Sequence, residues 1–285
     1  MPGLTDKLIN RLQVESWKAF FGVADQLDVG RPSAWPYAFR GQADAEWDLI
    51  PSFLRYCRRF DLSEQEALRI EAMGLAEFQS EAHLHISTSV LSTTTDTISW
   101  WTLMQQHGAP TRTLDWCASI YVACYFAVRG SPDKAGAVWL VHTQSIHEAL
   151  RNRYKEVELP KSEDEVRGRF LKVGGDPVVL FCERKNKTER MVAQRGVFSI
   201  CQNVLGDHGQ IIGNNLPEQT EPTLFAKLVI APQLKPEFLR KLRSMNITAR
   251  SLFPGLDGLG KSIEELFQAA AERGPTAPRQ ANATA

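Results

Sequence analysis

The segment "QQHGAPTRTLDWCASIYVACYFAV", residues 105–128, changes abruptly from polar to apolar. Its first half holds His107 and Asp115, and Gly108 with Pro110 predicts a turn that leads into a short strand at "PTRTLDW". Its second half, "SIYVACYFAV", carries no charge and predicts a buried helix packed behind that strand. We therefore expect the fold to be arranged around a polar strand held against an apolar helix.

Side chains alternate along a strand, so this strand should present two different faces. One face would carry Thr111, Thr113 and Asp115, and the other Arg112, Leu114 and Trp116. Some of these polar side chains should face a pocket, because the following helix is too apolar to be the solvated side. Alternatively, Arg112 and Asp115 form a buried ion pair that fixes the turn, and His107 caps the preceding helix instead of catalysing.

The remaining pattern predicts an α+β fold, with a mostly helical N-terminal region packed on a small mixed or antiparallel sheet. Neither a Rossmann glycine motif nor a P-loop occurs in the sequence. Capping boxes at Ser63 with Glu66 and at Ser262 with Glu265 mark two helix starts. Helices are expected at 16–27, 61–84, 99–106, 235–247 and 262–274, and further strands at 37–40, 135–143, 176–182, 196–202 and 224–231.

The composition excludes several classes of protein. Lys plus Arg and Asp plus Glu are both 33 in 285 residues, so no net positive charge argues for bulk binding to nucleic acid. The longest apolar run, 120–128, is too short to span a bilayer, and we expect a cytoplasmic protein without membrane contact. No metal site is predicted, because His83 and His85 lack a third ligand. Five cysteines without a CxxC pair indicate free thiols in a reducing compartment.

The segment "AFRGQ" contains the first candidate for ligand binding. The guanidinium of Arg40 suits a phosphate, which it can bind with two parallel hydrogen bonds. Gly41 has no Cβ, so a ligand could approach its backbone closely. The alternative is that Arg40 pairs with a local carboxylate, Asp44 or Asp48.

The segment "TERMVAQRGVFSI" contains the second candidate. Strand alternation would place Gln194 and Gly196 on one face, where the amide could hydrogen-bond a ligand or only a neighbouring loop. Residues 184–195 hold five cations against one anion, Glu189. This basic patch either meets a phosphate-rich partner or is a solvated loop.

Taken in order, four segments resemble the successive motifs of the FRG-domain family, which is named for Phe-Arg-Gly, here Phe39 to Gly41. They are "FRGQADAEWDLIPSFLR", "WWTLMQQHGAPTRTLDWCASIYVACYFAV", "ERMVAQRGVFSI" and "SLFPGLDGLG". The resemblance implies a single domain over 16–267, preceded by an N-terminal extension over 1–15. Residues 268–285 hold the end of the closing helix and a tail that is expected to be disordered, because it has almost no bulky apolar residues.

The family's run Gln-His-x-Gly-x-Pro-Thr-Arg-Leu-Leu-Asp-Trp is similar to residues 105–116 without a gap. Gln106 stands where the histidine is usual, and Thr113 replaces a leucine. His107 then occupies the variable position of the run.

At longer range the family resembles the ADP-ribosyltransferase fold, in which an arginine-bearing strand holds NAD. A Ser/Thr-bearing strand and a helix follow it, and a later strand supplies Glu or Gln. The resemblance implies NAD as substrate, a nucleic-acid or protein acceptor, and a role in bacterial or phage toxin or defence systems. The implied catalytic residues are Arg40, Asp115, Gln194 and His107, and the implied cofactor-binding residues are Phe39, Arg40, Gly41, Thr111, Arg112, Trp116 and Tyr125.

Asp115 would supply the anion that a neutral Gln194 lacks, with Glu183 as a weaker candidate. Two other functions remain open at this stage. The chain could be a nucleotide- or nucleic-acid-binding module without catalysis. It could also be a protein-interaction domain in which the motifs only stabilise the fold.

Overall fold

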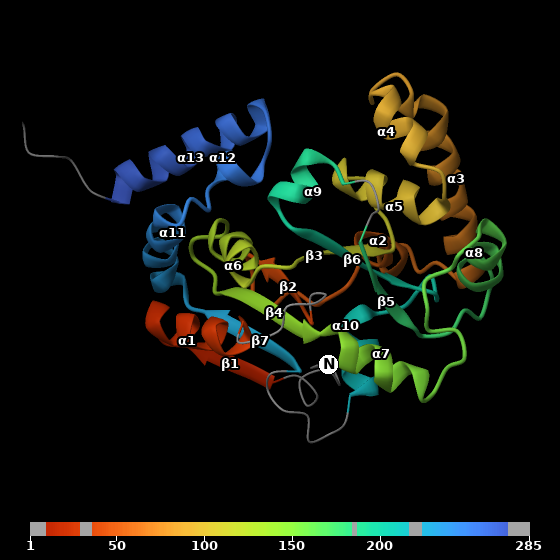
Figure 1. Cartoon of the computed structure of the whole chain (residues 1–285), viewed down its shortest axis with the longest axis horizontal. Helices are drawn as coiled ribbons and strands as arrows, with labels where there is room; N and C mark the ends of the chain where they lie inside the picture. The colour runs from red at the N-terminus through yellow and green to blue at the C-terminus, as the bar shows by residue number, and fades with distance from the viewer. Residues whose placement is uncertain (1–9, 29–35, 184–186, 217–223, 273–285) are drawn as a thin grey trace, which may run out of the picture.

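One seven-stranded sheet forms the centre of the computed structural model, which describes residues 10–28, 36–183, 187–216 and 224–272 (Figure 1). The strand order is β1-β7-β4-β2-β3-β6-β5. The β1–β7 pair is parallel and the other pairs are antiparallel. The predicted mixture of helices with one small mixed sheet is confirmed.

All six strands expected from the sequence are present, and β1 is an addition. The strands are β1 (Asn10–Val14), β2 (Tyr37–Gln42), β3 (Thr113–Cys117), β4 (Gly136–His142), β5 (Val179–Cys182), β6 (Gly196–Cys201) and β7 (Phe225–Ile230).

Helices cover both faces of the sheet and continue through the second half of the chain. They are α1 (Trp17–Asp28), α2 (Ser52–Arg59), α3 (Glu64–Ala82), α4 (Thr88–Thr93), α5 (Thr97–Gln106), α6 (Ile120–Val128), α7 (Thr143–Arg151), α8 (Glu163–Phe170), α9 (Glu189–Ala193), α10 (His208–Asn215), the 3-10 helix η2 (Pro232–Leu234), α11 (Lys235–Ser244), α12 (Ala249–Leu252) and α13 (Leu256–Glu272). In the part of the chain that the structure describes, none of these helices is both long and apolar enough to cross a membrane.

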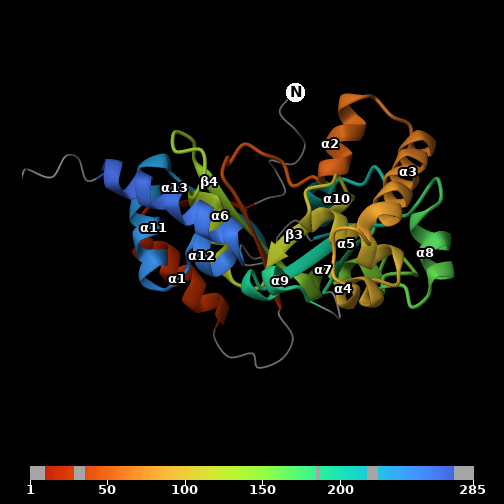
Figure 2. The same cartoon turned by 90° about the horizontal axis from the view of Figure 1, so that it is seen from above.

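Two apolar clusters lie on opposite faces of the sheet. One packs α1, α6, α11 and α12 on β2, β4 and β7, and the other packs α5, α7, α8 and α10 on the reverse face. Figures 1 and 2 both show the first group at one end of the molecule and α3, α5 and α8 at the other.

The capping box at Ser63 and Glu66 is confirmed, because each side chain bonds the other residue's backbone at the start of α3. The box at Ser262 is wrong. α13 already begins at Leu256, and the Ser262 hydroxyl donates to the carbonyl of Leu259 within the helix. The expected helix stop after residue 272 lies outside the described residues. Asn246 has φ 60°, as expected for a left-handed residue that ends α11.

Helix α6 lies so close to β2 and β4 that both strands need a glycine. A Cβ on Gly41 would lie 1.9 Å from the carbonyl oxygen of Ala123, and one on Gly136 would lie 2.1 Å from that of Ala127. Ala123 and Ala127 are one helical turn apart and both fully buried. Gly41 therefore accommodates the helix backbone, and it also lines the cleft described below, where its missing side chain was expected to admit a ligand.

We expect Gly41→Ala to lower the free energy of unfolding by about 1–3 kcal/mol, because a methyl group there overlaps the α6 backbone. Gly22→Ala in α1 is the matched control, since a Cβ added to Gly22 would meet nothing within 4 Å and alanine favours a helix. Urea denaturation of the two variants measures the difference. Equal stability of both variants would show that α6 does not pack this closely.

A buried arginine joins four segments to the start of β3. The Arg112 guanidinium binds both carboxylate oxygens of Glu71 in α3, with Nε to Oε1 at 2.7 Å. Its Nη1 donates to the carbonyls of Phe170, at 2.9 Å, and Gln202, at 3.1 Å. The guanidinium carbon lies 4.7 Å from the ring centre of Trp101. The side chains of Arg112 and Glu71 are 1% and 4% exposed.

The alternative of an Arg112–Asp115 ion pair is therefore wrong. Asp115 is exposed on the other face of β3, whereas Leu114 and Trp116 are buried on the face of Arg112, as the alternation predicts. A guanidinium with four hydrogen bonds to protein groups has little left to offer a cofactor.

Removing this arginine should destabilise the protein strongly. We expect Arg112→Ala to cost about 3–5 kcal/mol of unfolding free energy, because Glu71 would be left as an unpaired buried charge. Arg151→Ala breaks an exposed pair with Glu158 and should cost less than about 1 kcal/mol. Urea unfolding of both variants tests this prediction. Similar losses of unfolding free energy in the two variants would contradict a buried Arg112–Glu71 pair.

Candidate functional site

The sheet opens between β2 and β3, its two central strands. The described parts of these strands pair at one position, Phe39 with Cys117, whereas β2 pairs with β4 at six positions and β3 with β6 at five. Arg40 lies directly beyond the single pair. Its Nη1 donates to the backbone carbonyl of Asp115 at 2.6 Å, so a side chain bridges the strands where backbone hydrogen bonds are missing.

A cleft of about 210 Å³ lies beside this opening. Arg40 from β2, Asp115 from β3 and Gln194 from the turn before β6 all line it, although they are far apart in the sequence. Phe126 of α6 and Phe198 of β6 add aromatic surface. The volume is below the 300–1,000 Å³ typical of ligand pockets, so the cleft suits a small ligand or one end of a larger one.

The guanidinium of Arg40 keeps an unused hydrogen-bond donor. Its Nε is buried and has no partner among the described residues. Burial lowers the pKa of Arg40, and the Asp115 carboxylate opposes that shift. Neither predicted local carboxylate pairs with it, because Asp44 binds Lys134 at 2.5 Å and Asp48 contributes a backbone carbonyl to Gln42. A partly buried cation with an unpaired donor favours an anionic ligand.

A chain of hydrogen bonds orients the Asp115 carboxylate. Gln105 Nε2 donates to its Oδ2 at 3.1 Å, and Gln105 Oε1 accepts from the hydroxyl of Thr111 at 2.5 Å. The hydroxyls of Thr111 and Thr113 are 2.8 Å apart. Gln105 was not among the predicted site residues. Gln105 is the first residue of the motif run 105–116. Its amide side chain is not ionisable, so no pattern in the sequence marked it as a site residue.

Gln194 reaches the cleft from a helix end, not from a strand. α9, which the sequence analysis did not predict, ends at Ala193, and Arg195 has φ 49° before β6 begins at Gly196. The Gln194 Nε2 donates to the carbonyl of Leu252 at 3.1 Å, which leaves its amide oxygen for other partners.

Part of the predicted basic patch lies at the mouth of the cleft. Arg190 lines the cleft, and its guanidinium carbon is 5.2 Å from the ring centre of Phe253. Arg129 and Lys261 approach the same ring, at 5.2 and 5.3 Å. Residues 184–186 of the patch lie outside the described residues, and Lys187 pairs with Glu183.

Residues 35–135 match the family model described as the FRG domain. The chain contains an FRG domain. The motifs had indicated this family, and the matched residues include Arg40 and Asp115 but end before Gln194. Comparison of the chain with curated proteins and with solved structures gave no match.

Several residues that the FRG resemblance implied lie away from the cleft. His107 ends α5 as its C-cap and faces a second hollow. Phe39 packs in the core on the α6 side and stacks on Tyr37. The Tyr125 hydroxyl donates to the Glu265 carboxylate, and burial raises its pKa.

Trp116 does line the Arg40 cleft, but the residue is 1% exposed. Its indole nitrogen donates to the Ser199 hydroxyl at 2.7 Å. Phe126 is therefore better placed than Trp116 to stack on the ring of a bound ligand.

Cys117 also lines the cleft, but it is a poor nucleophile. Burial, followed by the Asp115 carboxylate, raises the pKa of its thiol to about 12, so the thiolate is scarce at neutral pH. No group of three or more potential metal ligands gathers within the described residues.

All five cysteines are free and buried, so native FRG-domain protein should resist thiol reagents. Burial raises the pKa of Cys57 to about 11 and those of Cys182 and Cys201 to about 12, and raises the pKa of Cys124 well above its usual value. At pH 8 each thiolate fraction is then at most about one in a thousand. Ellman's reagent should label the five thiols rapidly only after denaturation. A thiol that reacts at once in the native protein would contradict this description.

Proposed function

We propose that this FRG-domain protein is an NAD-dependent ADP-ribosyltransferase whose substrate binds in the Arg40 cleft. The acceptor would be a nucleic acid or a protein within a bacterial or phage toxin or defence system. One observation carries the proposal: a guanidinium with a free buried donor, a carboxylate and an amide converge in one cleft from three distant segments.

The arrangement of the strands supports the proposal. Arg40 lies on the central strand β2, the threonine-bearing β3 is its neighbour, and α6 follows β3. Gln194 precedes β6, which pairs with β3. This is the order of arginine, Ser/Thr and Glu/Gln segments that the resemblance to ADP-ribosyltransferases implies. This support is an analogy between folds. The proposed chemistry therefore has to be argued from the site residues themselves.

Each cleft residue has a role in this chemistry. Arg40 would bind the phosphate next to the nicotinamide ribose, and Phe126 would pack on the nicotinamide ring. When the ribose–nicotinamide bond breaks, positive charge develops on the sugar, and the Asp115 carboxylate would stabilise it. Gln105 would hold that carboxylate in position, and the free amide oxygen of Gln194 would accept a hydrogen bond from a ribose hydroxyl.

The size of the cleft decides which part of NAD it holds. A volume of about 210 Å³ accommodates the nicotinamide end, so the adenosine would extend over the mouth towards Arg190. A binding module without catalysis is the second candidate. It is favoured by the neutral Gln194, whose Nε2 is already engaged by Leu252.

Two substitutions separate binding from catalysis. Arg40→Gln should weaken NAD binding more than about tenfold, because a charge-assisted phosphate contact is lost. Asp115→Asn should leave NAD binding within a few-fold and slow nicotinamide release by about 100-fold or more. Calorimetry measures binding, chromatography measures nicotinamide, and transfer of labelled ADP-ribose to cell extract reports the acceptor.

Arg151→Gln serves as the control, since this exposed arginine lies on α7 away from the cleft residues. NAD binding without nicotinamide release in the wild type would establish the binding module instead. The cleft assignment would be overturned if Arg40→Gln bound NAD as the wild type does.

A further inference from the structure

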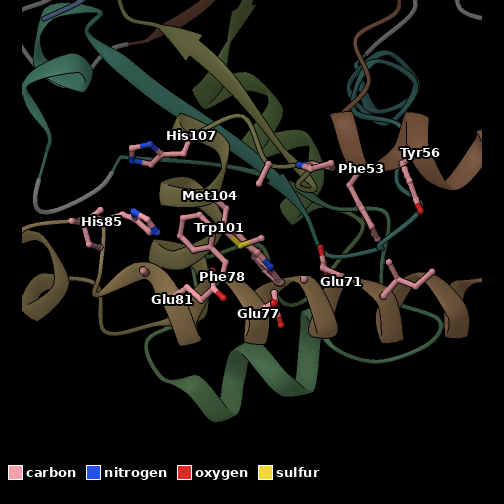
Figure 3. A pocket seen from close by; sticks show the side chains of 16 residues that line it. Phe53, Tyr56, Glu71, Glu77, Phe78, Glu81, His85, Trp101, Met104 and His107 are labelled. Atoms are coloured by element: carbon pink, nitrogen blue, oxygen red, sulfur yellow. The ribbon is translucent and has the colours of Figure 1, made fainter. Parts of the chain in front are cut away.

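A second and larger hollow lies between α2, α3 and α5. Its volume is about 600 Å³, within the range of small-molecule sites. We call it the α3/α5 groove and define it by Phe53, Gly74, Phe78, Trp101 and Met104, with the rim residues introduced below. Figure 3 shows Phe78, Trp101 and Met104 gathered between the two helices. The groove and the Arg40 cleft have no lining residue in common.

The floor of the groove is apolar and rigid. Phe53, Trp101 and Met104 are at most 5% exposed, so they are held by the core behind them. A glycine in the middle of a helix costs about 1 kcal/mol relative to alanine, yet α3 contains Gly74 at the groove. A Cβ added there would meet nothing within 4 Å, which means that the glycine leaves open space.

The rim of the groove is acidic. Glu77 and Glu81 are exposed one helical turn apart on α3, and neither side chain has an ion pair among the described residues. Glu71 also lines the groove, but Arg112 neutralises it. No described lysine or arginine lines the groove, and its other titratable side chains are the imidazoles of His85 and His107. Two unpaired carboxylates beside an aromatic floor attract a positive charge that is attached to an apolar body.

We propose that the α3/α5 groove is a binding site for a small organic cation, a molecule with an apolar body and an ammonium group. The apolar body lies on the partly exposed Phe78, Ile70 and Ile86, above the closely packed Trp101 and Met104, and the ammonium group lies near Glu77 and Glu81. An anionic molecule of the same shape is disfavoured by those two carboxylates. This site is independent of the NAD proposal, because none of its residues lines the Arg40 cleft.

A pair of probes with the same chain and opposite charge tests the proposal. Decyltrimethylammonium and decanoate, both below their micelle concentrations, are titrated into the full chain by calorimetry. The wild type should bind the cation at least about fivefold more tightly than the anion, as expected for two partly solvated ion pairs. Equal affinities, or tighter binding of decanoate, would overturn the proposal.

Filling the groove locates the binding site. Gly74→Leu should weaken decyltrimethylammonium binding at least about tenfold, because the new side chain occupies the open space while leucine suits a helix. Gly22→Leu on the exposed face of α1 makes the same change where nothing lies within 4 Å, and it should bind like the wild type. If Gly74→Leu keeps its melting temperature and still binds the cation normally, the site lies elsewhere and the proposal fails.

Removing the acidic rim tests the charge preference without touching the floor. In Glu77→Gln/Glu81→Gln the two probes should bind with affinities within about twofold of each other. Glu15→Gln/Asp133→Asn removes two exposed carboxylates outside the groove and should keep the preference of the wild type. A preference that survives the first double substitution, or disappears in the second, would show that overall charge and not the groove selects the cation.

Discussion

The buried guanidinium of Arg112 holds together the segments that surround the start of β3. A charge that is removed from water must be matched by partners, and here the partners come from α3, from the end of α8 and from the end of β6. These bonds fix the position where β3 begins. Three residues later along the chain, Asp115 lines the Arg40 cleft. The Arg112 guanidinium therefore positions the strand that carries Asp115, although Arg112 itself does not line the cleft.

Helix α5 separates the Arg40 cleft from the α3/α5 groove. Its last residues, Gln105 and Gln106, line the Arg40 cleft, whereas Trp101 and Met104 line the α3/α5 groove. Gln105 holds the Asp115 carboxylate directly. A displacement of α5 would thus change both hollows, because the same ten-residue helix forms a wall of each.

The Arg40 cleft exists because the sheet is incomplete at its centre. β2 lies against α6 at Gly41, and it pairs with β3 at the single position Phe39–Cys117. Arg40 then supplies the hydrogen bond that a backbone amide would have made in a continuous sheet. The Phe-Arg-Gly motif accordingly has three distinct physical tasks: Phe39 fills the core, Arg40 bridges the gap, and Gly41 admits the helix.

Secondary structure could be predicted from the amino-acid pattern wherever that pattern was strong: the strands, the apolar α6 and the capped start of α3 follow from periodicity, charge and turn residues within a few positions. The motifs also indicated the family, and of the residues that line the Arg40 cleft they indicated Arg40, Asp115 and Gln194 but not Gln105. The partners of those residues, in contrast, are set by the three-dimensional fold. Arg112 binds Glu71 across 41 residues and Arg40 reaches the Asp115 carbonyl across 75, and nothing local distinguishes such partners from nearer ones. The strand β1 and the use of Gly41 were missed for the same reason, since both depend on which distant backbone lies alongside.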